Sequence, residues 1–350
     1  MARWSLATRP GVPAGVAIFE LLAADADDLE RAFDLAGLAA APVGRCVLCD
    51  LFGVDRGIVA RWDDRSASLM PHGGPAVVAA VAARLNDLGF EPLPAGAGLS
   101  EADCVEMFPE ARSTVEARAL EVLGRAASPR AVDLLLAQHE RWRHAERDPA
   151  LRPDPSCEAI RRRLIDPPTV AAVGLANIGK SSLLNALAGR SVAGVADRAG
   201  TTRDFIGASI ELDGLAVRWI DTPGLLAPDA PCAHEADQAA ADLTRALLAR
   251  ADLIVLCFDA SAGGVGGVER GAVDRAAPGV PTIEAALRAD RTGENSARGS
   301  LSVSALRGEG LDRLARAVRS ALVPDEALDD PRAWRFWEDA PIAESPGRVP

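Results

Sequence analysis

The single lysine of this chain lies in a sequence pattern that binds phosphate. Lys180 is the only lysine, and all other basic side chains, of 38 in total, are arginine. It stands in Gly174-Leu175-Ala176-Asn177-Ile178-Gly179-Lys180-Ser181, which matches the phosphate-binding pattern G-x-x-x-x-G-K-[ST] at every fixed position. An ammonium is a compact point charge that fits within a ring of backbone amides, where a planar guanidinium cannot replace it. The segment predicts a nucleotide phosphate site formed by Asn177, Ile178, Gly179, Lys180, Ser181 and Ser182.

Two later segments predict residues for a metal ion and for a switch. Asp221-Thr222-Pro223-Gly224 follows a hydrophobic stretch, where a P-loop NTPase places its metal-side aspartate and the glycine that senses the γ-phosphate. Between it and the phosphate loop lies Gly200-Thr201-Thr202-Arg203-Asp204, where a switch threonine is expected to reach Mg²⁺. We therefore expect Ser181, Thr202 and Asp221 around Mg²⁺, with an ordinary strand-end acid as the alternative for Asp221.

The segment for base recognition is incomplete. A guanine site needs Asn-Lys-x-Asp, in which the aspartate pairs with the N1/N2 edge of the base and the lysine stem packs over the ring. The expected position holds Leu287-Arg288-Ala289-Asp290, so only the aspartate is present. Ser304-Ala305-Leu306 matches a Ser-Ala element that backs the guanine O6. We interpret Asp290, Ser304 and Ala305 as guanine contacts, with a loop aspartate as the alternative, and expect reduced affinity because unpaired polar groups are costly.

Alternating strands and helices must position these residues. Buried stretches at residues 170–173, 253–258 and 301–304 predict strands, and Asp213-Gly214 predicts a hairpin turn between two more. This pattern predicts an α/β P-loop domain over residues 167–323. An α+β module over residues 1–110 and a helical linker over residues 111–166 are predicted before it. Residues 324–350 are predicted to be a flexible tail that Trp334, Phe336 and Trp337 hold in part to a surface.

The composition limits the partners and the compartment. The net charge of −12 and the pI of about 4.9 create no overall field that attracts nucleic acid. The longest apolar stretch, from Val77 to Leu85, is interrupted by Arg84 and is too short to span a bilayer. No signal peptide is predicted, and Cys46-Val47-Leu48-Cys49 has no second pair to complete a zinc site. We expect a cytoplasmic protein with reduced thiols and no membrane contact.

The motifs resemble those of a known family. Residues 174–190, 200–204 and 210–224 resemble the G domain of the tRNA-modification GTPase MnmE (TrmE) family, within the wider TrmE–Era–Der group. This resemblance covers roughly residues 168–323. Gly15-Val16-Ala17-Ile18 and His72-Gly73-Gly74-Pro75 are similar to that family's folate-binding module. The resemblance implies binding of GTP and GDP, slow hydrolysis of GTP with Mg²⁺, a homodimer formed through the N-terminal module, a bound folate derivative, and a link to tRNA or to a partner modification enzyme.

The resemblance also implies roles for single residues. Asn177 matches the family's potassium-ligating asparagine, and K⁺ would then assist hydrolysis. Thr202 matches the magnesium threonine, and Thr201 lies in the loop that closes over potassium. Asp237 matches the family's water-activating glutamate, and Glu235 is the rival for that catalytic role because four extra residues precede it here.

Three departures put parts of this carry-over in question. Ala196 replaces a threonine of the family's potassium loop, and Pro-Gly-Arg-Val-Pro stands at the end in place of Cys-Ile-Gly-Lys. The second half of the family's helical domain is not recognisable. We therefore expect a retained switch with the modification chemistry lost, and the competing hypothesis is a degenerate G domain that acts as a scaffold without turnover. His72 is either a folate-site residue or a turn histidine.

Overall fold

The computed structural model of the chain describes residues 2–8, 14–38, 42–93, 101–175, 177–189, 206–222, 245–291 and 299–337. The chain divides into two compact units. The first contains Met1–Ala126, Ala131–Glu158 and Pro331–Pro350, and the second contains Ala127–Arg130 and Ala159–Asp330. The predicted boundary at residue 110 lies within the first of these units.

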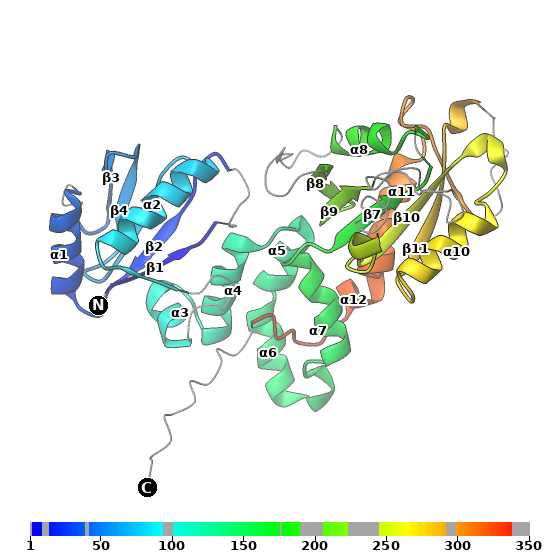
Figure 1. The fold of residues 1–350 in the computed structure, drawn as a ribbon. Helices are drawn as coiled ribbons and strands as arrows, with labels where there is room; N and C mark the ends of the chain where they lie inside the picture. The colour runs from blue at the N-terminus through cyan, green and yellow to red at the C-terminus, as the bar shows by residue number, and fades with distance from the viewer. Residues whose placement is uncertain are drawn as a thin grey trace, which may run out of the picture. The chain divides into compact units, whose positions relative to one another are not determined.

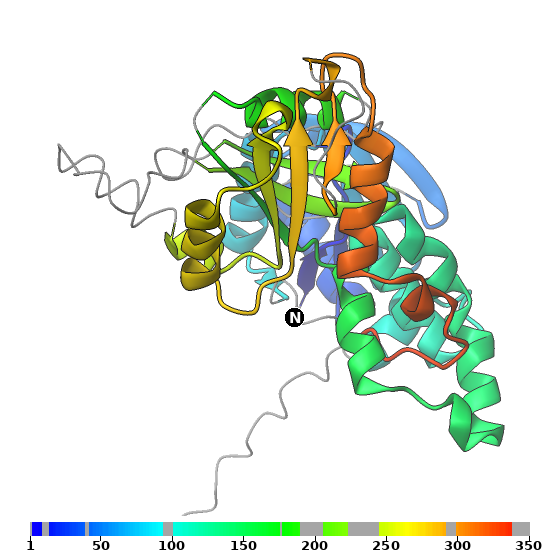
Figure 2. The same ribbon diagram turned by 90° about the vertical axis from the view of Figure 1, so that its right-hand side faces the viewer.

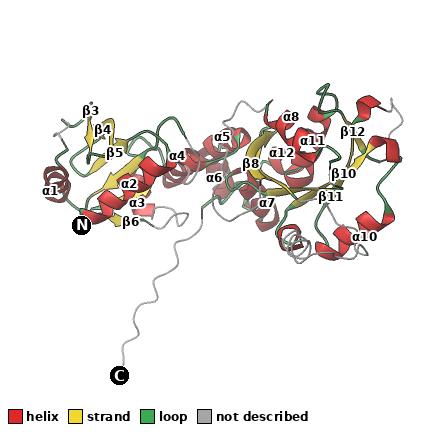
Figure 3. Ribbon diagram, turned by 45° about the horizontal axis from the view of Figure 1, so that its top comes forward, coloured by secondary structure: helices red, strands yellow, loops and turns green. Residues whose placement is uncertain are grey.

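The first unit begins with a six-stranded sheet in the order β3-β4-β5-β2-β1-β6. Its strands pair antiparallel, except that β1 pairs parallel with β6. Figure 3 shows α1 and α2 beside the strands of this sheet. The bounds are β1 Arg3–Leu6, β2 Phe19–Leu22, α1 Ala26–Ala36, β3 Arg45–Leu51, β4 Asp55–Arg61, β5 Ser66–Met70, α2 Pro75–Asp87 and β6 Glu91–Pro92.

One face of this sheet carries the core of the module. Alternate residues of the strands, such as Phe19 and Leu69, are fully buried together with Leu29 and Phe33 of α1 and Leu85 of α2. The helix α1 starts at Asp25, whose side chain accepts a hydrogen bond from the backbone N–H of Asp28. Alternate strand residues that share the core face, and one apolar stripe on each helix, thus produce the α+β layer that the sequence predicts.

The next helices lie mostly in the first unit, although α5 begins and α7 ends in residues of the second unit. Their bounds are α3 Glu101–Met107, α4 Thr114–Arg125, α5 Pro129–Leu136, α6 Gln138–Arg147, η1 Pro149–Leu151 and α7 Pro155–Arg161. The sequence predicts a flexible tail from residue 324 that Trp334, Phe336 and Trp337 hold in part to a surface, and these aromatic side chains contact one another in the structure. Trp334 and Phe336 are each only 1% exposed. The backbone N–H of Trp334 donates to the side-chain oxygen of Gln138, and the Trp142 indole donates to the Trp334 carbonyl. Aromatic burial outweighs the polar composition of this segment.

The second unit is a parallel sheet with one antiparallel edge. The strand order is β12-β11-β10-β7-β9-β8, and only β8 and β9 pair antiparallel. Figure 1 shows these strands with the helices that cover them. The bounds are β7 Thr169–Val173, α8 Lys180–Ala188, β8 Ile206–Leu212, β9 Leu215–Asp221, β10 Leu253–Asp259, α10 Gly267–Ala276, β11 Thr282–Leu287, η4 Ala289–Arg291, β12 Leu301–Val303, α11 Leu311–Leu322 and α12 Asp325–Asp329.

Helices lie on both faces of this sheet, and Figure 2 shows α10 and α11 on either side of it. Val273 and Ala277, in and just after α10, pack with Ile254 and Leu256 of β10. On α11, Leu314, Val318 and Leu322 are buried, and the helix contacts β8, β10, β11 and β12. Strands buried on both faces read as continuous apolar runs, which is why residues 253–258 could be predicted from the sequence.

A buried arginine inside the second unit is paired with two carboxylates. Arg319 of α11 is 3% exposed, and its Nε donates to Asp213 at the turn between β8 and β9 over 2.9 Å. The same guanidinium donates to Asp325 over 2.6 Å. Across the described parts of both units, no helix has the length and apolarity needed to cross a bilayer.

Candidate functional site

The phosphate loop joins β7 to α8 through backbone conformations that few residues adopt. Gly174 has φ +155°, and a Cβ atom there would lie 2.2 Å from the Cys257 carbonyl oxygen. Asn177 has φ +60° and Gly179 has φ +108°, and positive values of φ favour glycine and asparagine. The residue types at these three positions thus follow from the path of the loop. This path brings the free N–H groups of the first turn of α8 to the end of the loop, where they suit an anion.

Lys180 adds a positive charge at the same place. Its side chain is nearly buried, and its Nζ donates to the carbonyl oxygens of Gly174 over 3.2 Å and Leu175 over 3.1 Å. An ammonium carries three N–H donors, so these two bonds do not exhaust it. Burial raises the pKa of the Cys257 thiol to about 12, so the thiol stays neutral and does not offset the lysine charge. The lysine and the positive end of the helix dipole both favour a phosphate here.

Ser181 and Asp221 meet beside the loop. The Ser181 hydroxyl donates to Oδ2 of Asp221 over 2.6 Å. The other carboxylate oxygen, Oδ1, is buried and has no hydrogen-bond partner among the described residues. An unpaired buried carboxylate oxygen is costly, and carboxylate and hydroxyl oxygens are ligands that Mg²⁺ prefers. The pair therefore fits a magnesium site. Thr222 differs, because its hydroxyl is buried and donates to the Ala172 carbonyl over 2.8 Å, so this side chain serves the sheet.

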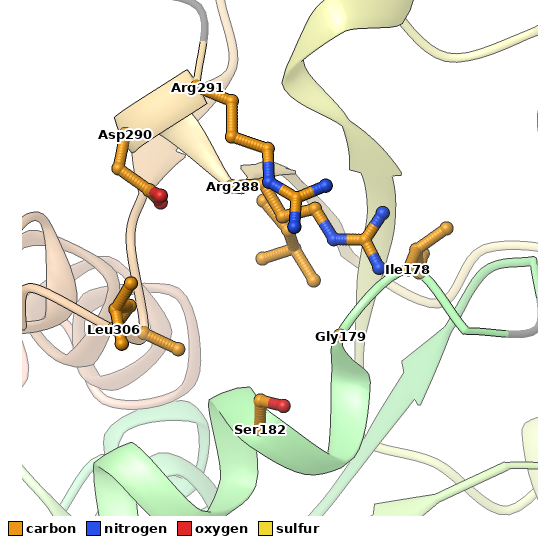
Figure 4. A pocket seen from close by; sticks show the side chains of 9 residues that line it. Ile178, Gly179, Ser182, Arg288, Asp290, Arg291 and Leu306 are labelled. Atoms are coloured by element: carbon orange, nitrogen blue, oxygen red, sulfur yellow. The ribbon is translucent and has the colours of Figure 1, made fainter.

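A cavity of about 240 Å³ joins the phosphate loop to the predicted base contacts (Figure 4). Ser304 is fully buried behind it, and its hydroxyl donates to Oδ1 of Asp290 over 2.7 Å. This hydrogen bond lowers the pKa of Asp290, so the cavity wall carries an ionised acceptor. The cavity is lined by Ile178, Gly179, Ser182, Leu287, Arg288, Asp290, Arg291, Ala305 and Leu306. The structure thus brings together five residues predicted from separate motifs: Ile178, Gly179, Ser182, Asp290 and Ala305.

Two residues of this site were missed by the sequence reasoning. Arg288 has φ +59°, its Nη1 lies 3.0 Å from Oδ2 of Asp259, and its Nη2 donates to the Asn177 carbonyl. Hydrogen bonds from Ser261, and then from Arg288, lower the pKa of Asp259. Arginine therefore ties the ends of β10 and β11 to the phosphate loop. The available signal was the position of Asp259 at the carboxyl end of a parallel strand, where α/β proteins bind ligands.

The two motifs of the N-terminal module also lie side by side. Val16 and His72 form an isolated antiparallel bridge, and the backbone N–H of Gly73 donates to the Gly15 carbonyl over 3.3 Å. Asp55 accepts from the His72 backbone over 2.8 Å, and its carboxylate lies 3.0 Å from Nδ1 of the ring. The hydrogen bond from the His72 backbone N–H is the main reason why the pKa of Asp55 is lowered. The β-bridge and Asp55 thus orient His72, and its folate role stays a prediction.

Several predicted site residues lie outside the described part of the chain. They lie within residues 190–205 and 223–244, so the structure does not test their predicted roles. These residues are Ala196, Thr201, Thr202, Pro223, Gly224, Glu235 and Asp237.

Comparisons with known proteins match the same region. Residues 169–280 match the model of the family described as 50S ribosome-binding GTPase. The tRNA modification GTPase MnmE of Acidiphilium cryptum is 39% identical over 158 residues, which cover 45% of this chain and 34% of that protein. The MnmE of Rhodospirillum rubrum is 41% identical over 165 residues, with the same two shares. The match spans about a third of the length of these relatives, and this part of the chain is similar to part of them.

Part of this chain is also similar to a solved structure. Era of Aquifex aeolicus, bound to GDP and AlF₄⁻, is 24% identical and covers 44% of this chain and 56% of its own, with a TM-score of 0.36. This likeness is too low to carry an argument.

Proposed function

We propose that this domain binds GTP across the cavity at the phosphate loop and hydrolyses it slowly to GDP with Mg²⁺. The observation that carries the proposal is the shared wall of that cavity, in which Gly179 and Ser182 stand beside Asp290 and Ala305. A nucleotide needs an anion site and a base site within one ligand's reach, and this wall offers both. The match of residues 169–280 to a GTPase family supports the same proposal.

Each side chain then has a defined task. Lys180 and the first N–H groups of α8 hold the phosphates, and Ser181 with Asp221 holds Mg²⁺, to which Thr202 is added in the proposal. Bound magnesium supplies positive charge that stabilises the transferred phosphoryl group. Asp290 accepts from the guanine N1/N2 edge, with Ser304 holding its carboxylate in place. Asp237, or Glu235 as its rival, positions the attacking water, and Gly224 couples the γ-phosphate to switch movement.

Removal of the lysine tests the proposal. Loss of charge-assisted bonds of about 1.5–3 kcal/mol predicts that Lys180→Ala weakens GTP binding by roughly 10- to 150-fold and lowers turnover. The matched control is Arg84→Ala, which removes one exposed cation from α2 in the other unit. Binding is measured by calorimetry and turnover by phosphate release. The proposal fails if Lys180→Ala hydrolyses GTP at the rate of the unchanged protein.

A scaffold without turnover is the second candidate, and one observation favours it. Leu287 occupies the position where a complete guanine motif has an amide, and it is buried against the cavity. A scaffold of this kind would bind GTP no better than ATP and release no phosphate. The same titrations, repeated with ATP, separate the two candidates.

Four further features remain proposals that rest on the MnmE relatives. Those relatives are named as tRNA modification GTPases, and comparison of modified wobble uridines in a deletion strain tests a link to that process. A second proposal is that K⁺ bound at Asn177, which is exposed in the phosphate loop, speeds GTP hydrolysis. Comparison of the hydrolysis rate in K⁺ with the rate in Na⁺ tests it. Light scattering after removal of residues 1–110 tests whether the N-terminal module forms the homodimer. Folate binding beside His72 is tested by titration with a folate derivative.

A further inference from the structure

Arg288 adopts a backbone conformation that is rare for its residue type. It lies between β11 and η4 and has φ +59°, a left-handed value that few residues other than glycine and asparagine take. Such conformations cost free energy and persist where surrounding contacts maintain them, often at functional sites. The turn places the guanidinium in the wall of the cavity, and Figure 4 shows it directed toward the loop segment that carries Ile178.

One end of this guanidinium is anchored. Its Nη1 lies 3.0 Å from Oδ2 of Asp259, the last residue of β10. The Asp259 carboxylate is itself fixed, because Oδ1 accepts from the backbone N–H of Ser261 over 2.9 Å and from its hydroxyl over 2.6 Å. These hydrogen bonds also keep the carboxylate ionised, since they lower its pKa. The arginine thus has a fixed, negatively charged support outside the phosphate loop.

The other end of the guanidinium holds the phosphate loop. Its Nη2 donates to the carbonyl oxygen of Asn177. No peptide bond in the described residues is cis, and in a trans peptide the carbonyl and the next N–H point in opposite directions. The bond therefore turns the N–H of Ile178 away from Arg288. Asn177 and Gly179 flank Ile178 with positive values of φ, and backbone N–H groups in turns of this kind form concave anion sites.

Lys180 and Arg288 divide the carbonyl groups of the loop between them. Lys180 donates to Gly174 and Leu175, and Arg288 donates to Asn177. Under the proposed function the lysine also serves the phosphates, so its contacts with the loop change when a nucleotide binds. Arg288 is anchored on β10 and needs no such change.

We propose that Arg288 is a positioning residue of the phosphate loop. Held by Asp259, it keeps the Asn177 carbonyl turned toward itself, so that the loop offers N–H groups and not a carbonyl oxygen to the phosphates. The inference rests on the proposed function, because it concerns the phosphate part of the same site, but it does not depend on which base is bound. A carbonyl released from Arg288 is free to face the phosphate oxygens, and two acceptors that face each other form no hydrogen bond.

The test uses inorganic pyrophosphate and GDP, titrated calorimetrically into the full chain with Mg²⁺. Arg288→Met keeps a long side chain and removes the guanidinium. We expect both ligands to bind about 10-fold more weakly, by the same factor, because the loss lies at the phosphates that they share. Arg288→Lys should recover part of this loss, since an ammonium still donates to the Asn177 carbonyl but lacks the planar fork that also engages Asp259.

Arg291→Met is the matched control. Arg291 lines the same cavity, and Figure 4 shows its guanidinium beside that of Arg288. Its side chain is exposed and makes no hydrogen bond or ion pair with another described residue. The control removes the same charge from the same wall without removing a bond to the loop. We therefore expect the affinity for pyrophosphate to change by less than about 2-fold.

The outcomes separate this inference from the proposed function. If Arg288→Met weakens GDP binding and leaves pyrophosphate binding unchanged, Arg288 acts at the base or the sugar and the inference is overturned. Equal weakening by Arg291→Met would also overturn it, because only the charge of the wall would then matter. Equal affinity of the unchanged protein for GDP and ADP would instead overturn the guanine assignment of the proposed function and leave this inference standing. If Arg288→Met does not fold, Asp259→Asn tests the same anchor: we expect pyrophosphate to bind about 3-fold more weakly, and an unchanged affinity would contradict the proposal.

Discussion

The replacement Asp221→Asn should stabilise the ligand-free protein and weaken its response to Mg²⁺ and nucleotide. In the ligand-free chain, Oδ2 accepts from Ser181, and Oδ1 is buried without a partner among the described residues. Asparagine keeps an oxygen for Ser181 and removes the negative charge from the unpaired position. Since an unsatisfied charged group costs more than a neutral one, we expect a gain of about 1 kcal/mol in the free energy of unfolding in EDTA.

With ligand bound, Asp221→Asn should lower the free energy of unfolding instead of raising it. At a ligand concentration of about 100 times Kd, binding raises the free energy of unfolding by about 2.7 kcal/mol. Loss of one charge-assisted metal contact of about 2 kcal/mol weakens binding roughly 30-fold. At the same ligand concentration the variant then gains only about 0.9 kcal/mol.

Urea denaturation followed by circular dichroism measures both quantities, in EDTA and with Mg²⁺ plus a non-hydrolysable GTP analogue. Asp34→Asn is the matched control, because it makes the same chemical change on the exposed face of α1. A magnesium site at Asp221 is refuted if Asp221→Asn is less stable than the unchanged protein in EDTA and still gains the full increment of about 2.7 kcal/mol with ligand.

Three further replacements test other parts of the structure by urea denaturation. Trp334→Ala should lower the free energy of unfolding by about 3–5 kcal/mol, because the indole is 1% exposed; an unchanged midpoint would contradict its packing. Burial raises the pKa of Glu20, although the Ser68 hydroxyl donates a hydrogen bond to it. Glu20 therefore stabilises the fold at a pH below its pKa in the unfolded chain, about 4.3, and this stabilisation is lost as the pH rises through its pKa in the folded chain. Glu20→Gln should therefore stabilise at pH 7.5 and not at pH 4, and the reverse order would refute this sign. Arg319→Met should lower the free energy of unfolding by about 2 kcal/mol. This is less than the loss of a fully buried ion pair costs, because Asp213 keeps some solvent contact. An unchanged free energy of unfolding would show that only the apolar volume of the side chain matters at this position.

The second unit was the more predictable part of the chain. Its strands are buried on both faces, so Leu253 to Phe258 form a continuous apolar run, and Asp213-Gly214 has the turn chemistry of a two-residue hairpin. The phosphate loop was predictable because Gly174 and Gly179 occupy positions that other residues cannot adopt without strain. Local sequence is sufficient where the backbone or one sheet face dictates the residue type.

The rest depends on contacts between distant segments. Trp334, Phe336 and Trp337 indicate that the segment packs on a surface, but they do not identify that surface, which includes Trp142 almost two hundred positions earlier. Arg288 finds Asp259 and the Asn177 carbonyl only because parallel strands align their carboxyl ends. Side-chain partners of this kind follow from strand order, which periodicity alone does not give.

The most direct test of the account is a calorimetric titration of the full chain with a non-hydrolysable GTP analogue and its ATP counterpart, in Mg²⁺ and in EDTA. Binding should favour guanine by about 10-fold or more, weaken in EDTA and be lost in Lys180→Ala. Equal binding of both nucleotides, or binding that Lys180→Ala leaves unchanged, would contradict the assignment of this cavity as a GTP site.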